Sequence, residues 1–165
     1  MTLDRELPER TKHLASREPR RPKQASLRRA VSSAYYALFH LLIREATVLL
    51  APPSPPHLWP LVARAFQHNE MRAVARTFES GGSLGSHHPR IQPSPELREV
   101  AGALRKLQEA RHAADYDLQV KFTRATVALL LLEAERAFTT WSKIRRDEDA
   151  KVFLTALLLE KRWRR

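Results

Sequence analysis

Two stretches of the sequence place side chains suited to phosphate binding or proton transfer at helical spacing. The first stretch carries cationic, hydroxyl and imidazole groups at Arg29, Ser32, Ser33, Tyr36 and His40. Because Tyr36 and His40 are four residues apart, they lie on one face of a helix and can meet there. The alternative is that the tyrosines are core aromatics whose hydroxyls are satisfied at the rim of a bundle.

The second stretch reads Arg111-His112-Ala113-Ala114-Asp115-Tyr116. Arg111 and Asp115 are also four residues apart, and this spacing predicts an ion pair within one helix. If exposed, such a pair contributes roughly a few tenths of a kcal/mol; if buried, it needs polar partners from Tyr35, Tyr36 or His40 across the bundle. Alternatively, Arg111, Asp115 and Tyr116 have a purely structural role and stabilise the end of the helix.

Other motifs that carry chemistry are absent or incomplete. The adjacent histidines His87 and His88 lie in a glycine-rich loop without a third ligand at a recognisable spacing, so we expect a solvated loop and no metal site. The sequence has no glycine-rich phosphate loop, no serine elbow and no two-histidine zinc helix. These absences argue against the common nucleotide-hydrolysing, serine-hydrolase and zinc-protease schemes, and we expect no cofactor.

Helices must position both stretches, because the chain shows no sustained apolar and polar alternation typical of strands. The strongest helical periodicity covers residues 23–50 and ends at a proline-rich segment. Further helices are expected over 3–16, 57–66, 69–78 (capped by Asn69), 94–114 (capped by Ser94), from the cap Thr123 through Trp141, and over 147–163.

These elements predict an all-α fold, an up-and-down helical bundle of four principal helices with short additional helices. A length of 165 residues fits one domain over residues 1–165. Within that domain we expect a core at 23–145, an N-terminal extension at 1–22 and a C-terminal amphipathic helix at 147–165.

The charge balance favours an anionic partner. Lysine and arginine together number 29 against 18 acidic residues, which leaves a net charge of +11, and 22 of the 29 are arginine. Arginine binds phosphate through a planar fork of donors, so the surface should attract RNA or a nucleotide. The alternative is a solvated basic surface without a specific partner.

Membrane and extracellular classes fit the sequence poorly. The longest purely apolar run, Val127 to Leu132, is far shorter than the roughly 20 residues of a membrane span. The first residues lack the apolar segment of a signal peptide, and the chain contains no cysteine. We therefore expect a cytoplasmic protein that has no membrane partner.

Two motifs resemble the HEPN superfamily (higher eukaryotes and prokaryotes nucleotide-binding domain). One is the helix Leu27 to Leu42 with its "AYYALFH" segment, and the other is the "R-x-x-x-D-Y" corner within Arg111 to Asp117. The likeness spans about residues 23–145 and is greatest to small stand-alone prokaryotic members. It implies a helical bundle that pairs into a homodimer. Many members are metal-independent endoribonucleases of toxin–antitoxin, CRISPR-linked or antiviral defence systems; others are non-catalytic partners.

In active members of that superfamily, an arginine is followed after four to six residues by a histidine. The ribose 2′-hydroxyl attacks the adjacent phosphate, the histidine transfers protons and the arginine stabilises the added charge. Here Arg111 matches the arginine and His112 the polar residue that often follows it, but Asp115 to Leu118 stand where the histidine is expected. Arg105 and His112 satisfy the spacing only in a register that begins earlier in the helix.

The resemblance thus implies a catalytic set and a phosphate-binding set. The first is Arg111 on the scissile phosphate with His112 or His40 as proton carrier, and Asp115 or Tyr116 as further candidates for proton transfer. The second, for nucleic acid or phosphate, comprises Arg29, Tyr36, Asp115 and Tyr116. Both sets require that the two stretches converge in the folded bundle.

Two alternatives to a ribonuclease stay open. One is a non-catalytic helical interaction module, a subunit of a larger defence complex or the partner of an antitoxin protein. It would use the apolar row Val152, Phe153, Ala156 and Leu157, if that row is exposed. The other is a purely structural bundle whose basic surface binds nucleic acid only weakly.

Overall fold

The fold is all-α, as the sequence predicted. The computed structural model describes residues 23–50, 59–83 and 90–163, so the predicted helix 3–16 and the pair His87-His88 lie outside the described residues. Within them the only β pairing is an isolated bridge between Ser83 and Arg90. The helices are α2 (Gln24–Leu50), α3 (Trp59–Ala65), α4 (His68–Ser80), α5 (Pro95–Tyr116), α6 (Arg124–Ile144) and α7 (Glu148–Trp163).

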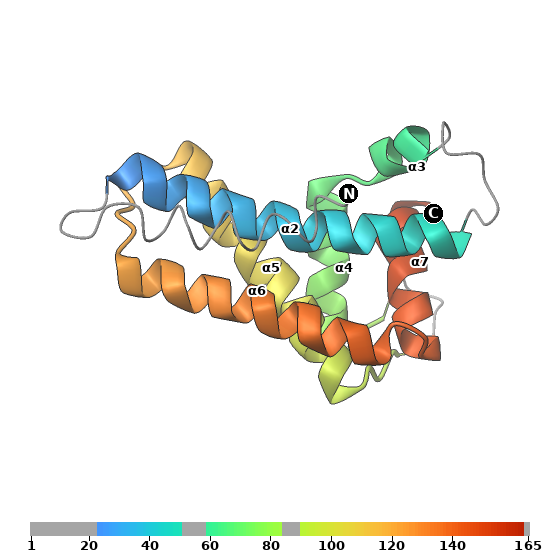
Figure 1. Ribbon diagram of the computed structural model, residues 1–165. Helices are drawn as coiled ribbons and strands as arrows, with labels where there is room; N and C mark the ends of the chain where they lie inside the picture. The colour runs from blue at the N-terminus through green and yellow to red at the C-terminus, as the bar shows by residue number, and fades with distance from the viewer. Residues whose placement is uncertain (1–22, 51–58, 84–89, 164–165) are drawn as a thin grey trace.

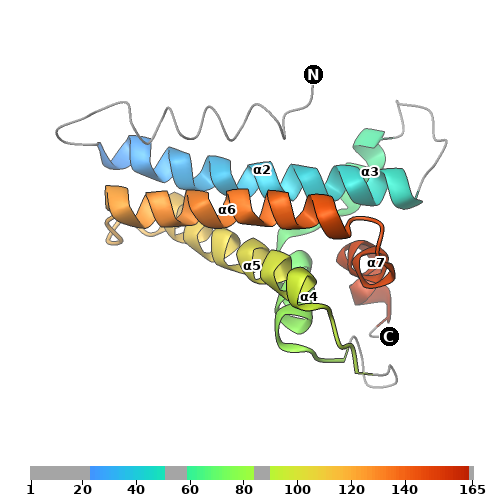
Figure 2. The same ribbon diagram turned by 60° about the horizontal axis from the view of Figure 1, so that its bottom comes forward.

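Three long helices form the body of the bundle. Figures 1 and 2 show α2 and α6 running side by side in the same direction, with α5 antiparallel to both. Helix α4 packs between α5 and α7, and α7 also contacts α2 near the end of that helix. The prediction of a helical bundle is confirmed. Among the described helices, none is long and apolar enough to cross a membrane.

Apolar stripes on the helices form the core. In α5, the side chains of Leu97, Val100, Leu104 and Leu107 are fully buried, and they meet Leu38 of α2 and Trp141 of α6 in one cluster. Burying each such side chain stabilises the fold by roughly 1.5 to 3 kcal/mol.

The apolar row on α7 is mostly buried, contrary to the exposure that an interaction module would need. Phe153, Ala156 and Leu157 pack in the core, where the ring of Phe153 meets Phe78 of α4 at a centroid distance of 4.9 Å. Val152 is exposed. Helix α7 therefore uses this face to cover α4 within its own chain, and the row offers no free docking surface.

Local capping explains where the helices begin and end. Ser94 accepts a hydrogen bond from the amide of Leu97, and Thr123 accepts one from Thr126, as predicted for the starts of α5 and α6. The expectation that Asn69 caps α4 is wrong, because the helix begins at His68 and its N-cap, Gln67, makes no side-chain capping bond. Helix α4 ends at Ser80, and its C-cap, Gly81, has a left-handed φ of 70°, which suits a residue without a Cβ.

The connection between α5 and α6 is fixed to the first turns of α2. Arg28 donates to the carbonyl oxygens of Ala113, Ala114, Asp117 and Val120. The carbonyl of Ala114 lies in the last turn of α5, where carbonyls lack helical partners. Ala113 also accepts from the amide of Asp117, and Asp117 and Val120 belong to the connection itself. The Gln24 side chain exchanges two hydrogen bonds with the backbone of Phe122, at 2.8 and 3.0 Å. Together these contacts set the register in which α2 lies against the last turns of α5.

We expect Arg28→Ala to lower the free energy of unfolding by about 2 kcal/mol, because several backbone carbonyls lose a charged donor. Arg29→Ala is the matched control at the neighbouring, exposed position. Its effect should stay within about 0.5 kcal/mol. Urea denaturation followed by circular dichroism measures the free energy of unfolding of both variants. Equal losses would show that the hydrogen bonds of Arg28 do not stabilise the connection between α5 and α6.

Candidate functional site

The two stretches that carry the candidate functional residues, 29–40 on α2 and 111–116 on α5, lie together on one side of the bundle. Because α2 and α5 are antiparallel, Ser32 lies opposite Asp115 and Tyr36 lies opposite Arg111. The Ser32 hydroxyl donates to Asp115 Oδ1 at 2.7 Å, and Arg111 Nη2 donates to the Tyr36 hydroxyl at 3.0 Å. We call these four residues the α2–α5 seam.

Arg111 is the cation of the seam, and it is largely enclosed. Its side chain is only 16% exposed, and its Nε lies 2.6 Å from Asp115 Oδ2. The Nε–H is not aligned for a hydrogen bond to that oxygen, so the attraction within the pair is chiefly coulombic. The guanidinium also lies over the rings of Tyr36 and Tyr116, at 5.5 and 5.7 Å from their centroids.

The surroundings of Arg111 favour its charged form. Burial alone would lower the pKa of its guanidinium, but the nearby oxygens of Tyr36, Asp115 and Tyr116 raise that pKa above the ordinary value. The side chain is therefore a permanent cation at the protein surface. Asp115 neutralises part of its charge and holds it in place.

The other predicted residues lie around this centre. His40 is exposed and stacks on Tyr36 at a centroid distance of 6.1 Å, and the exposed His112 contacts the ring of Tyr116 at 5.1 Å. Tyr116 is 67% exposed, which leaves much of its ring free for a ligand. Arg29 is exposed on α2, and no contact in the described part of the chain joins it to the seam.

His68 belongs to the same site, although the sequence did not indicate it. It is the first residue of α4, and its ring stacks on Phe39 at 4.5 Å and meets the edge of Tyr36 at 6.2 Å. Its Nδ1 lies 2.6 Å from the hydroxyl of Tyr35, and its carbonyl accepts a bond from Gln108 Nε2. Burial, followed by the nearby charges of Arg111 and His40, lowers the pKa of the His68 imidazole.

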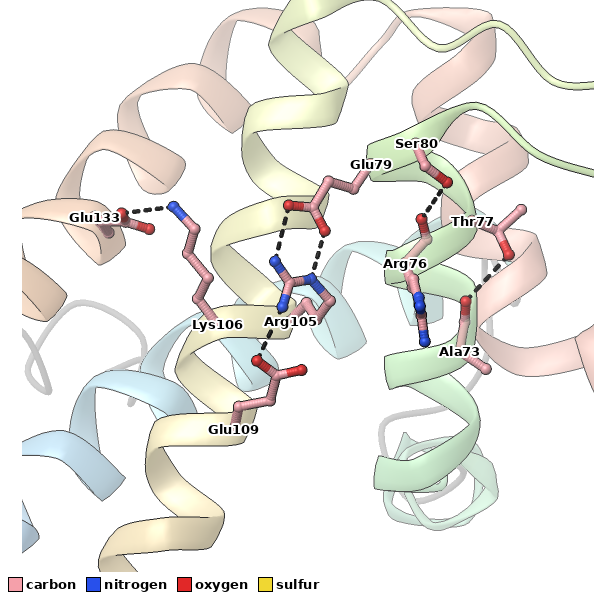
Figure 3. A network of polar contacts seen from close by, with 9 residues as sticks. All are labelled: Ala73, Arg76, Thr77, Glu79, Ser80, Arg105, Lys106, Glu109 and Glu133. Atoms are coloured by element: carbon pink, nitrogen blue, oxygen red, sulfur yellow. Dashed lines mark hydrogen bonds and ion pairs between the residues drawn. The ribbon is translucent and has the colours of Figure 1, made fainter. Parts of the chain in front are cut away.

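Arg105, the arginine of the alternative register, lies in a network of ion pairs away from the seam. Arg105 binds both carboxylate oxygens of Glu79 on α4, through Nε and through Nη2 at 3.0 Å, and donates to Glu109 at 2.9 Å (Figure 3). Two carboxylates thus neutralise this guanidinium on the face of α5 that meets α4. Arg111 is the better candidate for the functional arginine.

Within the described residues, no metal cluster lies at the seam, and two large grooves lie elsewhere. In the described ranges, no group of three or more histidine or acidic side chains is placed to hold a metal ion. A groove of about 510 Å³ lies instead between α2 and α6, where Leu41, Phe138 and Trp141 line it together with the ion pairs of Glu45. Its largely apolar lining is unsuited to phosphate. A larger groove, of about 670 Å³, lies between α4 and α5, where Arg72, Arg76 and Arg105 line it together with Glu79 and Glu109. We place the candidate site at the seam because the two motifs of the sequence meet there.

Comparison of the chain with models of protein families, with curated proteins and with solved structures finds no match. The resemblance to the HEPN superfamily therefore rests on the two sequence motifs. In the fold these motifs become the two sides of the α2–α5 seam.

We expect Glu79→Gln to destabilise the protein at pH 7 by about 1 kcal/mol, because Arg105 loses its bidentate partner at a partly exposed site. Hydrogen bonds from Arg105 lower the pKa of Glu79 in the folded state. The stabilisation is therefore present above the ordinary carboxyl pKa and is lost as the pH falls through the folded value.

Urea denaturation of both proteins at pH 7 and pH 3 measures this difference, which should shrink at pH 3. Glu133→Gln is the control, because Glu133 forms a single bond to Lys106 at an exposed position (Figure 3). If the free energies of unfolding of wild type and Glu79→Gln differ by the same amount at both pH values, the ionised Glu79 carboxylate does not stabilise the fold through Arg105.

Proposed function

We propose that the α2–α5 seam binds a phosphate group of RNA, and that the chain is a HEPN-like RNA-binding protein able to act as a metal-independent endoribonuclease. The observation that carries the proposal is the contact between Arg111 and Tyr36. It joins the two motifs of the resemblance around one partly buried guanidinium.

The donors of Arg111 support phosphate binding. A guanidinium has five N–H groups in a planar fork. One Nη2 hydrogen is directed at Tyr36 and the Nε side faces Asp115, so further hydrogens of the fork are available for phosphate oxygens. The exposed ring of Tyr116 next to the guanidinium is suited to stacking on an RNA base.

Cleavage at this site would follow the chemistry of internal transesterification. The ribose 2′-oxygen attacks the adjacent phosphorus as a base removes its proton, and the bond to the 5′-oxygen breaks as an acid protonates that oxygen. The products are a cyclic phosphate and a 5′-hydroxyl. Arg111 stabilises the charge added at phosphorus. His112 and His40 border the seam on Tyr116 and Tyr36, so they are the candidate proton carriers.

The same resemblance supports a biological setting. We propose a cytoplasmic homodimer of a toxin–antitoxin or antiviral defence system that acts with a partner protein. Binding without cleavage is the second candidate function, and a specific observation favours it: Asp115 to Leu118 stand where active members carry the histidine. The exposed Leu129 and Leu132 on α6 offer a surface for a partner protein in that case.

Arg111→Ala should weaken binding of single-stranded RNA at least tenfold, because a charge-assisted bond to phosphate contributes about 1.5 to 3 kcal/mol. The slope of log affinity against log salt should also fall in magnitude by about 1. Fluorescence anisotropy measures both quantities. Arg136→Ala, an exposed charge on α6, is the matched control. Equal affinity of Arg111→Ala and wild type would remove Arg111 from the site.

Incubation of the same RNA in EDTA separates the two candidate functions. Fragments that end in a cyclic phosphate, formed by wild type and lost in Arg111→Ala, identify a metal-independent ribonuclease. The variants His112→Ala and His40→Ala then show which histidine transfers protons. Tight binding that depends on Arg111, without fragments, identifies the non-catalytic protein.

A further inference from the structure

We propose that His68 is a phosphate-binding residue of the seam, where its neutral imidazole donates the Nε2 hydrogen to a ligand oxygen beside Arg111, and that Tyr35 holds it in this tautomer. The inference rests on the proposed function for the identity of the ligand, a phosphate of RNA. The tautomer itself depends only on the contacts inside the protein.

Tyr35 determines which nitrogen of His68 carries the proton. Its side chain is fully buried, and in the described part of the chain His68 Nδ1, 2.6 Å away, is the polar partner of its hydroxyl. A buried hydroxyl hydrogen needs an acceptor. If Nδ1 carried the proton and donated to Tyr35, the phenolic hydrogen would have none. Burial also raises the pKa of Tyr35, so the hydroxyl keeps its hydrogen. Nδ1 is therefore the acceptor, and the imidazole proton resides on Nε2.

The ring of His68 is fixed in position. Phe39 stacks on it at 4.5 Å, Tyr36 meets it edge-on, and Gln108, itself buried, donates to the carbonyl of His68 at 2.6 Å. The ring is half-buried, and within the described ranges its Nε2 has no hydrogen-bond partner. This atom is not fully buried, so solvent reaches it. The Nε2–H group is thus open to a ligand.

The charges around His68 keep it neutral. It is faced by Tyr35, Tyr36 and His40 from α2 and by Arg111 from α5, while Glu70 and Arg72 follow it on α4. Burial, followed by coulombic interactions with Arg111 and His40, lowers its pKa, so near neutral pH the imidazole carries one proton. A neutral imidazole with its proton on Nε2 has no lone pair there, so His68 donates a hydrogen bond but does not serve as the base at this atom.

Arg111 and His68 are both neighbours of Tyr36, and the charge of Arg111 acts on the His68 imidazole. Tyr36 touches both groups, with Arg111 over its ring and the edge contact to His68 on the same side chain. A permanent cation next to a fixed neutral N–H group can bind two oxygens of one phosphate without bringing two positive charges together. His68 therefore adds directional binding to the charge that Arg111 supplies.

Long-range ¹H–¹⁵N correlation spectra of the full chain test the tautomer directly. We expect His68 to show the Nε2–H form with a pKa below the ordinary value, and its Nε2–H signal should shift on addition of inorganic phosphate. In Tyr35→Phe the tautomers should mix and the pKa should rise, because the hydroxyl that favours the neutral form is lost. An Nδ1–H tautomer in the wild type would overturn the proposal, whether or not the protein cleaves RNA.

Substitutions of His68 test its role toward RNA, with 2′-O-methylated RNA as a probe that binds but offers no 2′-hydroxyl for attack. We expect His68→Ala to weaken binding about tenfold and His68→Gln, whose amide places a neutral donor near the position of Nε2, to retain affinity within about threefold. Equal losses in the two variants would overturn the proposal. If Arg111→Ala leaves RNA affinity unchanged while inorganic phosphate still shifts the Nε2–H signal, the proposed function fails but the His68 donor stands, with free phosphate as its ligand.

Discussion

The site depends on the stabilisation of one cation, Arg111, in a position where water supplies only part of its solvation. A guanidinium that is mostly removed from solvent must regain that solvation from the protein. Asp115 provides an opposite charge, Tyr36 provides an acceptor, and the rings of Tyr36 and Tyr116 provide polarisable faces. Each partner comes from α5 itself or from the antiparallel α2. The proposed phosphate-binding surface therefore exists only in one register of these two helices.

That register is set away from the seam, at the end of α5. Arg28 binds four carbonyl oxygens there, and Gln24 pairs with the backbone of Phe122. These bonds are directional, so they add a specific alignment to the apolar packing of the core beneath them. The hydrogen bonds of Arg28 and Gln24 thus give the side chains of the α2–α5 seam a defined alignment. Their role is structural, although Arg28 is of the same residue type as the cation of the site.

Sequence reasoning identified the parts of the site that follow from local spacing. The periodicity of 23–50, the caps Ser94 and Thr123, and the Arg111–Asp115 pair all depend on residues within one or two turns, and the structure contains each of them. His68 is different, because its partner Tyr35 lies 33 positions away and nothing in the surrounding sequence distinguishes it from a surface histidine. Likewise, Arg28 and Arg29 are adjacent in the chain but point to different sides of α2, and only the packing of α5 separates their roles.

The most direct test of the account is a crystal structure of the protein with single-stranded RNA that carries 2′-O-methyl groups. The account predicts a phosphate oxygen within hydrogen-bond distance of both the Arg111 guanidinium and His68 Nε2, with a base stacked on Tyr116. RNA bound elsewhere on the basic surface, with Arg111 still in contact only with Tyr36 and Asp115, would contradict it.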